Sequence, residues 1–253
     1  KRRFDGAFSL RTIAMDSSRV HSCEAHSGIG GLPLPPSILD ILRFLSGGVC
    51  HQLPDRSLQA LGVVSPLCAR CTGTYLGAFV GLLAILVRGR TRASLLPRWP
   101  TLAAFTLFFF LWGADGLNSY LTLIPGAPYL YQPNNGLRLL TGILEGIALS
   151  LAIWPLVAFT LWHRPDQREV ICFRELLLLV LAASGIAIVF SRPLAATLYL
   201  GALLSAAGLF GMFAILNALL LTAILRREGT AERFSQLMPL LGAALVASVI
   251  ELA

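Results

Sequence analysis

Six long apolar segments occupy most of this chain, and they restrict its fold more than any other feature. They run over residues 72–87, 102–114, 137–161, 175–190, 194–225 and 234–252. About 20 apolar residues suffice for a helix to cross the hydrocarbon core of a bilayer. Only helices and closed barrels satisfy all of their backbone hydrogen bonds there. We therefore predict an all-α fold, a polytopic integral membrane bundle of about six transmembrane helices, with the lipid bilayer as its first partner.

Two of these segments have unusual lengths. The segment at 102–114 is short, whereas the segment at 194–225 is too long for one upright helix and too short for two. We expect the longer one to be a single tilted or kinked helix, bent near Gly208 and Gly211. Asn217 lies inside it, and we expect this amide to hydrogen bond to a neighbouring helix.

The composition excludes a soluble fold and argues against a nucleic-acid partner. Of the 253 residues, 56% are hydrophobic and only 13% are charged, whereas soluble domains carry roughly 25% charged residues. A net charge of +7 would suggest nucleic-acid binding in a soluble protein. Here half of the 20 basic residues lie in three short loops between apolar segments. We therefore assign the positive charge to membrane topology and expect no nucleic acid.

The arginines also predict an orientation in the membrane. Ten lie in the loops after the first, third and fifth segments, which share one side, and four lie on the other side. Basic loops remain in the cytoplasm, so we expect the loop at 115–135 and the cysteine motif described below to be extracytoplasmic. The ten are Arg88, Arg90, Arg92, Arg98, Arg164, Arg168, Arg174, Arg226, Arg227 and Arg233, and the four are Arg56, Arg70, Arg138 and Arg192.

The chain divides into three predicted parts. Residues 1–36 are polar and end in a Gly- and Pro-rich stretch, which is typical of a flexible arm. Residues 37–150 begin with a short amphipathic segment at 37–45 that is too short to span and is expected to lie at the interface. Three spans and a Cys/His motif complete this part. Residues 151–253 hold the C-terminal membrane helices.

The Cys/His motif is the feature with the clearest chemistry. Cys50 and His51 precede the first span, and Cys68 and Cys71 form a CxxC pair at its start. Thiolate and imidazole are the ligand types of a tetrahedral zinc site. We therefore predict a metal site, with zinc as the metal, from Cys50, His51, Cys68 and Cys71.

The predicted helix start supports thiolate chemistry at the CxxC pair. Ser65 suits an N-cap and Pro66 the first helical position. Cys68 would then lie in the first turn, with Cys71 on the same face. The positive end of the helix dipole favours thiolate over thiol, and thiolates serve both metal binding and thiol exchange.

A disulfide is the main alternative for these cysteines. A Cys68–Cys71 or a Cys50–Cys68 bond would be natural on an oxidising side of the membrane. The chain has five cysteines, an odd number that argues against a complete disulfide framework. The residues alone leave the metal and the disulfide interpretations open.

Four ionisable residues are expected near the same membrane surface. Charges at this depth are costly and usually face the bundle interior or a cavity, so they predict either a structural ion pair or a functional pocket. Tyr129 and Tyr131 in the adjoining loop are interpreted as part of an interfacial aromatic belt. The four ionisable residues are Arg70, Asp115, Arg138 and Glu145.

Glycines recur every four residues in the first and third spans. Small residues at this spacing allow two helix backbones to approach closely, so we expect these spans to touch and to set Glu145 beside Cys71. The glycines are Gly73, Gly77 and Gly81 in the first span and Gly142 and Gly146 in the third.

The residues around the cysteines resemble those of a known family. Cys50-His51-Gln52, the stretch PLCARCTGTYLG at 66–77, Asp115-Gly116 and the stretch NGLRLLTG at 135–142 carry the resemblance. The family is an uncharacterised one of prokaryotic membrane proteins, classed as a domain of unknown function, and the match covers about residues 45–150. The resemblance implies a multi-pass protein of the prokaryotic cell (inner) membrane and supplies no activity.

Three functions remain compatible with these residues. The residues do not decide whether the protein is an enzyme. The leading hypothesis is an extracytoplasmic Cys/His zinc site in a structural protein or an accessory subunit of a larger membrane complex. The first alternative is a quinone-linked thiol-disulfide oxidoreductase that uses Cys68 and Cys71, with Cys50 as shuttle. The second is a small-solute or ion transporter, with Arg138 and Glu145 on the path.

Overall fold

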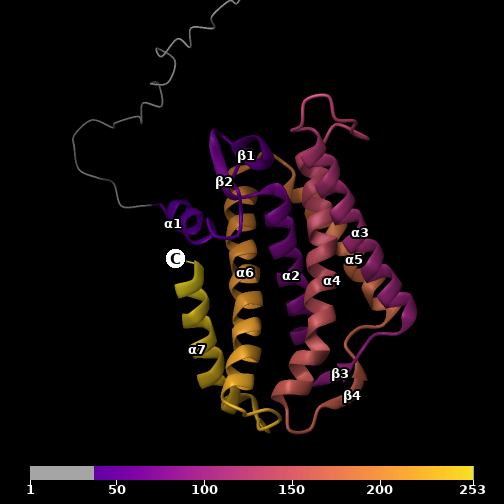
Figure 1. Ribbon diagram of the computed structural model, residues 1–253, viewed down its shortest axis with the longest axis vertical. Coiled ribbons are helices and arrows are strands. Elements are labelled where there is room, and N and C mark those ends of the chain that lie inside the picture. Colours follow the sequence, from indigo (N-terminus) through magenta and orange to yellow (C-terminus); the bar gives the residue numbers. More distant parts are fainter. Residues whose placement is uncertain (1–36, 253) are drawn as a thin grey trace, which may run out of the picture. The chain divides into compact units, whose positions relative to one another are not determined.

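The computed structural model describes residues 37–252, and long helices dominate this part of the chain (Figure 1). Six of them, α2 to α7, are long and apolar enough to cross a membrane, which confirms the predicted all-α membrane bundle. The predicted flexible arm lies outside the described residues. The helices are α1 (Ile38–Leu45), α2 (Ala69–Val87), α3 (Trp99–Leu121), α4 (Asn135–Leu161), α5 (Phe173–Phe190), α6 (Ala195–Ile224) and α7 (Phe234–Leu252).

Two small strand pairs, which the sequence analysis did not predict, close the ends of the bundle. β1 (Ser57–Ala60) and β2 (Val63–Cys68) form an antiparallel hairpin before α2. β3 (Ala93–Leu95) and β4 (Asp166–Glu169) pair in parallel between two loops at the opposite end. A short 3₁₀ turn, η2 (Pro54–Arg56), precedes β1.

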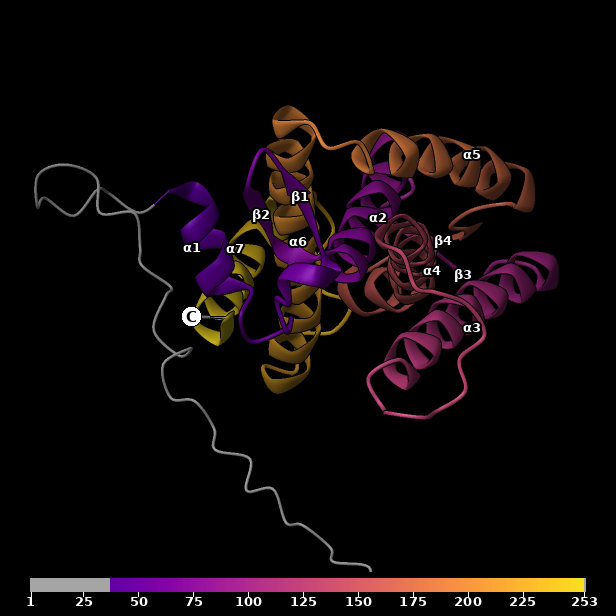
Figure 2. The ribbon, with the colours of Figure 1, turned by 90° about the horizontal axis from the view of Figure 1, so that it is seen from above.

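Helix α4 is the central helix of the bundle. In the 18-residue apolar stretch of α4 that could span the membrane, 67% is buried inside the protein, against 17% for the same stretch of α3 and 22% for that of α5. Viewed from above, α4 lies between α2, α3 and α5 (Figure 2). Leu139, Ile143 and Ile147 are fully buried along it. Its run from Asn135 to Leu161 also carries the chain through residue 150, where the sequence analysis had placed a boundary between two parts.

Helices α2 and α4 meet backbone to backbone through their glycines. A Cβ added to Gly77 would overlap the carbonyl group of Ile143, and one added to Gly146 would overlap the carbonyl group of Thr74. Gly73 and Gly142 face each other in the same way. The five predicted glycines therefore all lie at the contact between these two helices. At four of them a larger side chain would meet the partner backbone, and at Gly81 it would meet the Ser150 side chain.

Helix α6 also packs against α2 through a glycine. It is one unbroken helix of 30 residues, as predicted for the longest apolar segment. A Cβ on Gly208 would overlap the carbonyl group of Tyr75 in α2, so Gly208 serves a helix contact. The three helices α4, α2 and α6 thus lie side by side (Figures 1 and 2). Asn217 donates to Ser248 at 3.1 Å and to Glu251 at 3.0 Å in α7, which confirms the predicted interhelical bond.

The predicted start of the first span was wrong. Ser65 and Pro66 belong to β2, and Cys68 is both the last residue of this strand and the N-cap of α2. The hairpin turn is formed by Leu61 and Gly62, with φ angles of 50° and 79°. A turn with two positive φ values suits a two-residue hairpin, and a leucine in the first position concealed it.

The predicted end of the second span was also wrong. Helix α3 continues to Leu121, although Asp115 was expected to end it. Asp115, Asn118 and Ser119 lie three and four positions apart and are all buried on one helix face. Their polar groups have partners inside the protein, so the helix continues through them.

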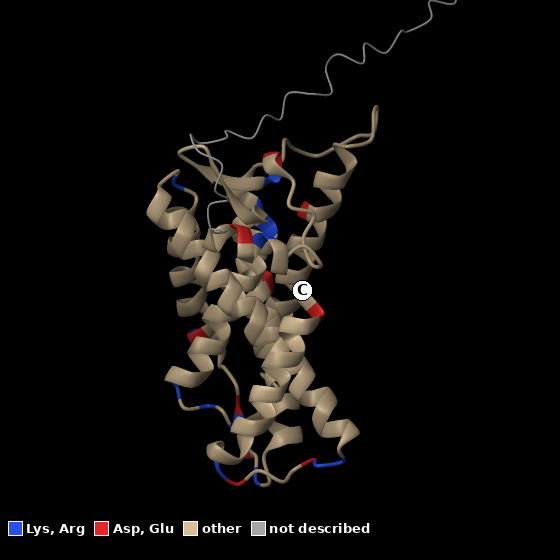
Figure 3. Ribbon diagram, turned by 90° about the vertical axis from the view of Figure 1, so that its left-hand side faces the viewer, with Lys and Arg blue, Asp and Glu red and all other residues tan. Residues whose placement is uncertain are grey.

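The three arginine-rich loops share one end of the bundle, as the alternation of spans predicted. Arg92 stacks on Trp162, 4.4 Å from the ring centroid, and donates to the carbonyl of Glu232, so it joins all three loops. Figure 3 shows the basic residues of these loops together at that end. The β1–β2 hairpin, α1 and the α3–α4 loop lie at the other end.

The glycine contact predicts the effect of a single substitution. Gly77→Leu should destabilise the bundle by about 3 kcal/mol or more, because the side chain meets the Ile143 backbone, which cannot move aside without separating two helices. Gly113→Leu in α3 is the matched control, since a Cβ there meets nothing within 4 Å. Thermal unfolding in detergent measures the difference. A Gly77→Leu protein as stable as the control would show that the contact is not required.

Candidate functional site

Three cysteines from separate positions in the chain meet at the hairpin end of the bundle. Cys50 follows α1, Cys68 ends β2, and Cys71 lies in the first turn of α2. Their Sγ atoms all lie within 4.8 Å of one another. Cys50 is buried, and the other two are half-buried. Helix α2 and the β1–β2 hairpin bring Cys68 and Cys71 together, and the loop after α1 adds Cys50.

Two backbone N–H groups donate to the Cys50 sulfur. They belong to Cys68, at 3.2 Å, and to Gln52, at 3.4 Å. Gln52 has a φ of 51°, a left-handed conformation. Its side-chain amide donates to the carbonyl of Arg43 at 2.6 Å and to Ser46 Oγ at 3.1 Å. Gln52 therefore holds the Cys50 loop in place, a role that sequence reasoning did not assign to it.

The three thiols influence one another's ionisation. Hydrogen bonds with the Cys50 and Cys71 thiols, together with backbone N–H groups of the α2 start, hold the pKa of the Cys68 thiol far below its ordinary value. The same interaction with Cys68 raises the pKa of Cys50. These hydrogen bonds therefore favour the thiolate form at Cys68 over that at Cys50. Further thiolates at this separation need a nearby cation to offset their repulsion.

His51 lies apart from the sulfur cluster. Its side chain is exposed, and its ring nitrogens are not part of the group of ligand atoms within 4.8 Å. Of the four predicted metal ligands, the structure thus gathers Cys50, Cys68 and Cys71. A role for His51 as the fourth ligand stays a prediction.

A polar network lies beside the cluster and begins at Arg70, between the two cysteines of the CxxC pair. Arg70 forms an ion pair with Asp115 in α3, which is 2% exposed. Tyr131 donates its hydroxyl to the other carboxylate oxygen of Asp115 at 2.6 Å. Partial burial and this hydrogen bond raise the pKa of Tyr131 to about 12, so it remains a donor at neutral pH. Tyr131 therefore belongs to the site, although it was assigned to an interfacial belt.

Ser119 connects three arginines within this network. Its hydroxyl accepts from Arg70 at 3.2 Å and from Arg138 at 3.3 Å, and its carbonyl accepts from Arg56 at 3.1 Å. Arg138 also donates to Asn135 at 2.9 Å. The network contains three guanidinium groups and one carboxylate, that of Asp115. It therefore has a net charge of two positive units next to the sulfur cluster. These charges favour anionic sulfur.

Glu145 lies deeper in the bundle, apart from Arg138. It is 5% exposed and faces Thr74 of α2, one helical turn below Cys71. Its Oε2 atom is buried and has no hydrogen-bond partner in the described part of the chain. The predicted group of four ionisable residues is therefore divided: Arg70, Asp115 and Arg138 share one network, and Glu145 stands alone under the cysteines.

The buried ion pair predicts a strong effect of removing its carboxylate. Asp115→Asn should destabilise the protein by about 3 kcal/mol or more, because Arg70 keeps its charge without a counterion in a half-buried position. Asp166→Asn is the control, since Asp166 is exposed in β4. Thermal unfolding of the two variants at one pH tests this. Equal stabilities would mean that solvent or other groups compensate Arg70.

Comparison with known proteins identifies this region as the shared part of the chain. The model of the family described as "Predicted membrane protein (DUF2085)" matches residues 50–152, from Cys50 into α4. An uncharacterized protein of Methanothermobacter thermautotrophicus is 33% identical over 103 residues, which cover 41% of this chain and 82% of that protein. An uncharacterized protein of Methanocaldococcus jannaschii is 28% identical over 109 residues, 43% of this chain and 63% of that protein.

No solved structure matches the chain. The aligned region contains the three clustered cysteines, the arginine network and the glycine contact of α2 with α4. It leaves out α5 to α7, which complete the bundle. The family model matches this region, and the alignment covers 82% of the Methanothermobacter protein; this chain therefore belongs to the DUF2085 family of membrane proteins.

Proposed function

We propose that Cys50, Cys68 and Cys71 bind one metal ion, and that the ion is zinc. The observation that carries this proposal is the convergence of three Sγ atoms, all within 4.8 Å of one another, from three separate positions in the chain. A structural role for this metal would join the α1 loop, the hairpin and the start of α2.

The donor set suits zinc in chemistry and in size. A tetrahedral zinc ion with Zn–S bonds of about 2.3 Å requires sulfurs about 3.8 Å apart, and the three sulfurs lie within 4.8 Å of one another. The two N–H groups on Cys50 and the N-terminus of α2 stabilise thiolate charge. The surplus positive charge of the network at Ser119 acts in the same direction.

The fourth position distinguishes two kinds of zinc site. A structural site is closed by a fourth protein ligand, whereas a site with three protein ligands leaves one position to water or to a substrate. We propose His51 as the closing ligand, because its exposed ring is free to turn. Since Cys50 and His51 are neighbours in the chain, both reach one ion only if the backbone between them adjusts. Closure would favour a structural role, either in this protein alone or as an accessory subunit of a larger membrane complex.

The same sulfur geometry also favours a second candidate, a thiol-disulfide oxidoreductase. Cys68 has a depressed pKa and two other thiols within 4.8 Å, as thiolate exchange requires. In that reaction Cys68 and Cys71 would form a disulfide, and two electrons and two protons would pass to a quinone to give the quinol. Cys50 would relay oxidising equivalents by exchange with this pair.

Metal content and thiol titration on one sample separate the two candidates. We expect one zinc per chain in the purified protein, with Cys50, Cys68 and Cys71 protected from alkylation until a chelator is added. Replacing any one of the three by Ala should abolish stoichiometric zinc and lower the thermal stability, because zinc contributes on the order of 10 kcal/mol in small structural sites. Cys172→Ser, at the opposite end of the bundle, should keep both.

The remaining outcomes decide against the proposal or refine it. A protein without stoichiometric metal in which two of the three cysteines are oxidised would exclude the metal site and leave a disulfide, either structural or redox-active. Cys71→Ala should then accumulate a mixed disulfide at Cys68. His51→Ala tests closure. Loss of zinc affinity indicates a closed site, whereas unchanged affinity with cobalt(II) absorption that responds to added anions indicates an open position.

We further propose that the cysteine end faces the outside of the cell. The ten arginines of the opposite loops support this orientation. Single cysteines introduced at Gly89 and Glu228, in a background without Cys23 and Cys172, should react with a membrane-impermeant maleimide only after the membrane is opened. A cysteine at Pro128 should react in intact cells. Labelling of Gly89 in intact cells would invert the orientation and place the sulfur cluster in a reducing compartment.

A further inference from the structure

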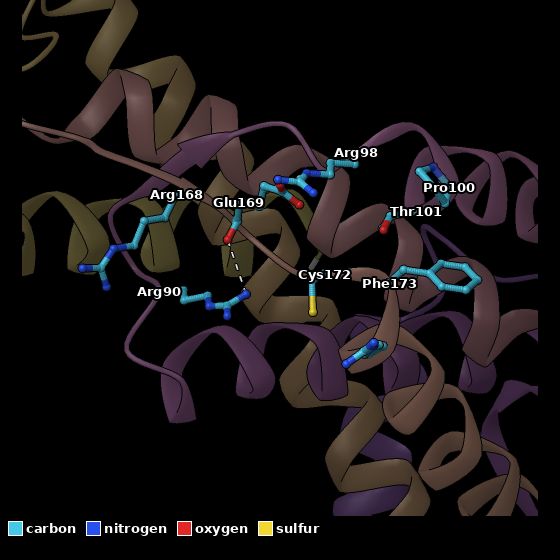
Figure 4. Close-up of a pocket in the computed structure, with 9 residues that line it drawn as sticks. Arg90, Arg98, Pro100, Thr101, Arg168, Glu169, Cys172 and Phe173 are labelled. Carbon is cyan, nitrogen blue, oxygen red and sulfur yellow. Dashed lines mark hydrogen bonds and ion pairs between the residues drawn. The ribbon is translucent and has the colours of Figure 1, made fainter.

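A second polar site lies at the arginine-rich end of the bundle, away from the cysteines. A cavity of about 650 Å³ opens between the first turns of α3 and α5 and the strand β4. Figure 4 shows the side chains that surround it, with Arg98 and Thr101 from the α3 side, Arg168 from β4, and Cys172 at the start of α5. None of these residues lies in the sulfur cluster or its polar network.

The cavity carries excess positive charge. Four arginines and one glutamate line it. Arg90 is held by Glu175 through two hydrogen bonds of 2.7 and 2.9 Å, and Arg98 pairs with Glu169 at 2.8 Å. The other two, Arg168 and Arg174, form no ion pair with a carboxylate of the described residues. The cavity wall therefore keeps two positive charges that no carboxylate of the described residues neutralises.

Two transmembrane helices begin at the same cavity. The first turn of α3 follows its N-cap Arg98, and the first turn of α5 follows its N-cap Cys172; both turns contribute lining residues. Helix starts present N–H groups without intrahelical acceptors and the positive end of the helix dipole. The capping box of α5 uses the N–H groups of Cys172 and Glu175, which leaves those of Phe173 and Arg174.

A buried hydroxyl group gives independent evidence for a ligand. Thr101 lines the cavity and is only 1% exposed, and its Oγ1 has no hydrogen-bond partner in the described part of the chain. An unsatisfied buried hydroxyl is costly, and most such groups in folded proteins have a partner. An acceptor oxygen in the cavity would satisfy it. The same acceptor would face the N–H groups of the α5 start.

We propose that this cavity binds a phosphate group, held by Arg174, the α5 N-terminus and the Thr101 hydroxyl, while Arg168 on the opposite wall adds positive charge. Phosphate offers several anionic acceptor oxygens, which match a guanidinium group and free backbone N–H groups. An anionic phospholipid is the source that the surroundings favour. Phe173, which lines the cavity, is 42% exposed, and Trp99, between Arg98 and Pro100 in the chain, is 77% exposed. An exposed Trp is typical of the membrane interface, where acyl chains could continue along the bundle.

Lipid binding to the purified full-length protein tests this proposal. Native mass spectrometry would measure the affinity for phosphatidylglycerol, with dioleoylglycerol as a ligand that has equal tails and no phosphate. The double variant Arg168→Gln/Arg174→Gln should weaken phosphatidylglycerol binding about tenfold or more, since one charge-assisted contact and a second positive charge at the cavity are lost. Thr101→Val, which keeps the side-chain shape, should weaken it about fivefold. Arg164→Gln/Arg227→Gln, from the same end but outside the cavity, should change it little.

Further binding measurements identify the source of the phosphate. Competition of bound phosphatidylglycerol by glycerol phosphate would support a shared headgroup site. Inorganic phosphate that binds with the same sensitivity to the variants, in a protein that ignores phosphatidylglycerol, would support the phosphate site with a soluble ligand. Equal binding of dioleoylglycerol, or an equal loss in the Arg164/Arg227 control, would overturn the proposal. Zinc content should remain unchanged throughout, so the result is independent of the cysteine site.

Discussion

The architecture depends on the backbone contact of α2 with α4 and α6. Gly77 and Gly146 allow the two backbones to touch at the first contact, and Gly208 does so at the second. In a bilayer the hydrophobic effect does not drive one helix against another, so close packing supplies much of the association energy. This contact also fixes the start of α2. The direction of that helix decides where the CxxC cysteines point and how Arg70 reaches Asp115.

The sequence predicted the features that depend on local composition. Hydropathy located all six spans, and for α7 even both ends, because each helix must be apolar over a length set by the bilayer. The prediction of two helix ends was wrong for the same physical reason. Asp115 looks like a residue that ends a helix, yet it is paired inside the bundle. Ser65 looks like an N-cap, yet it belongs to a strand. Tertiary partners, which no local pattern reveals, decided both.

The candidate site was predictable in its residue types and only partly in its geometry. The cysteines and Arg70 with Asp115 could be selected, because their chemistry is unusual at a membrane surface. Gln52 and Ser119 could not, since an amide and a hydroxyl are common in such loops and helices. Their roles arise from a left-handed φ and from the meeting of three arginines. Gln52 stands within the motif that carries the family resemblance, and that position was the available signal.

Cys68 is a weak N-cap for helix α2. It occupies the N-cap position, yet its side chain makes no capping hydrogen bond. Serine or aspartate there would stabilise the helix start by about 1 kcal/mol relative to a residue that does not cap. The chain therefore forgoes local helix stability at the residue where strand, helix and sulfur cluster join. Such a conflict between local preference and the residue present is typical of functional positions. Under the proposed zinc site, the start of α2 would be the part of the bundle that the metal stabilises most.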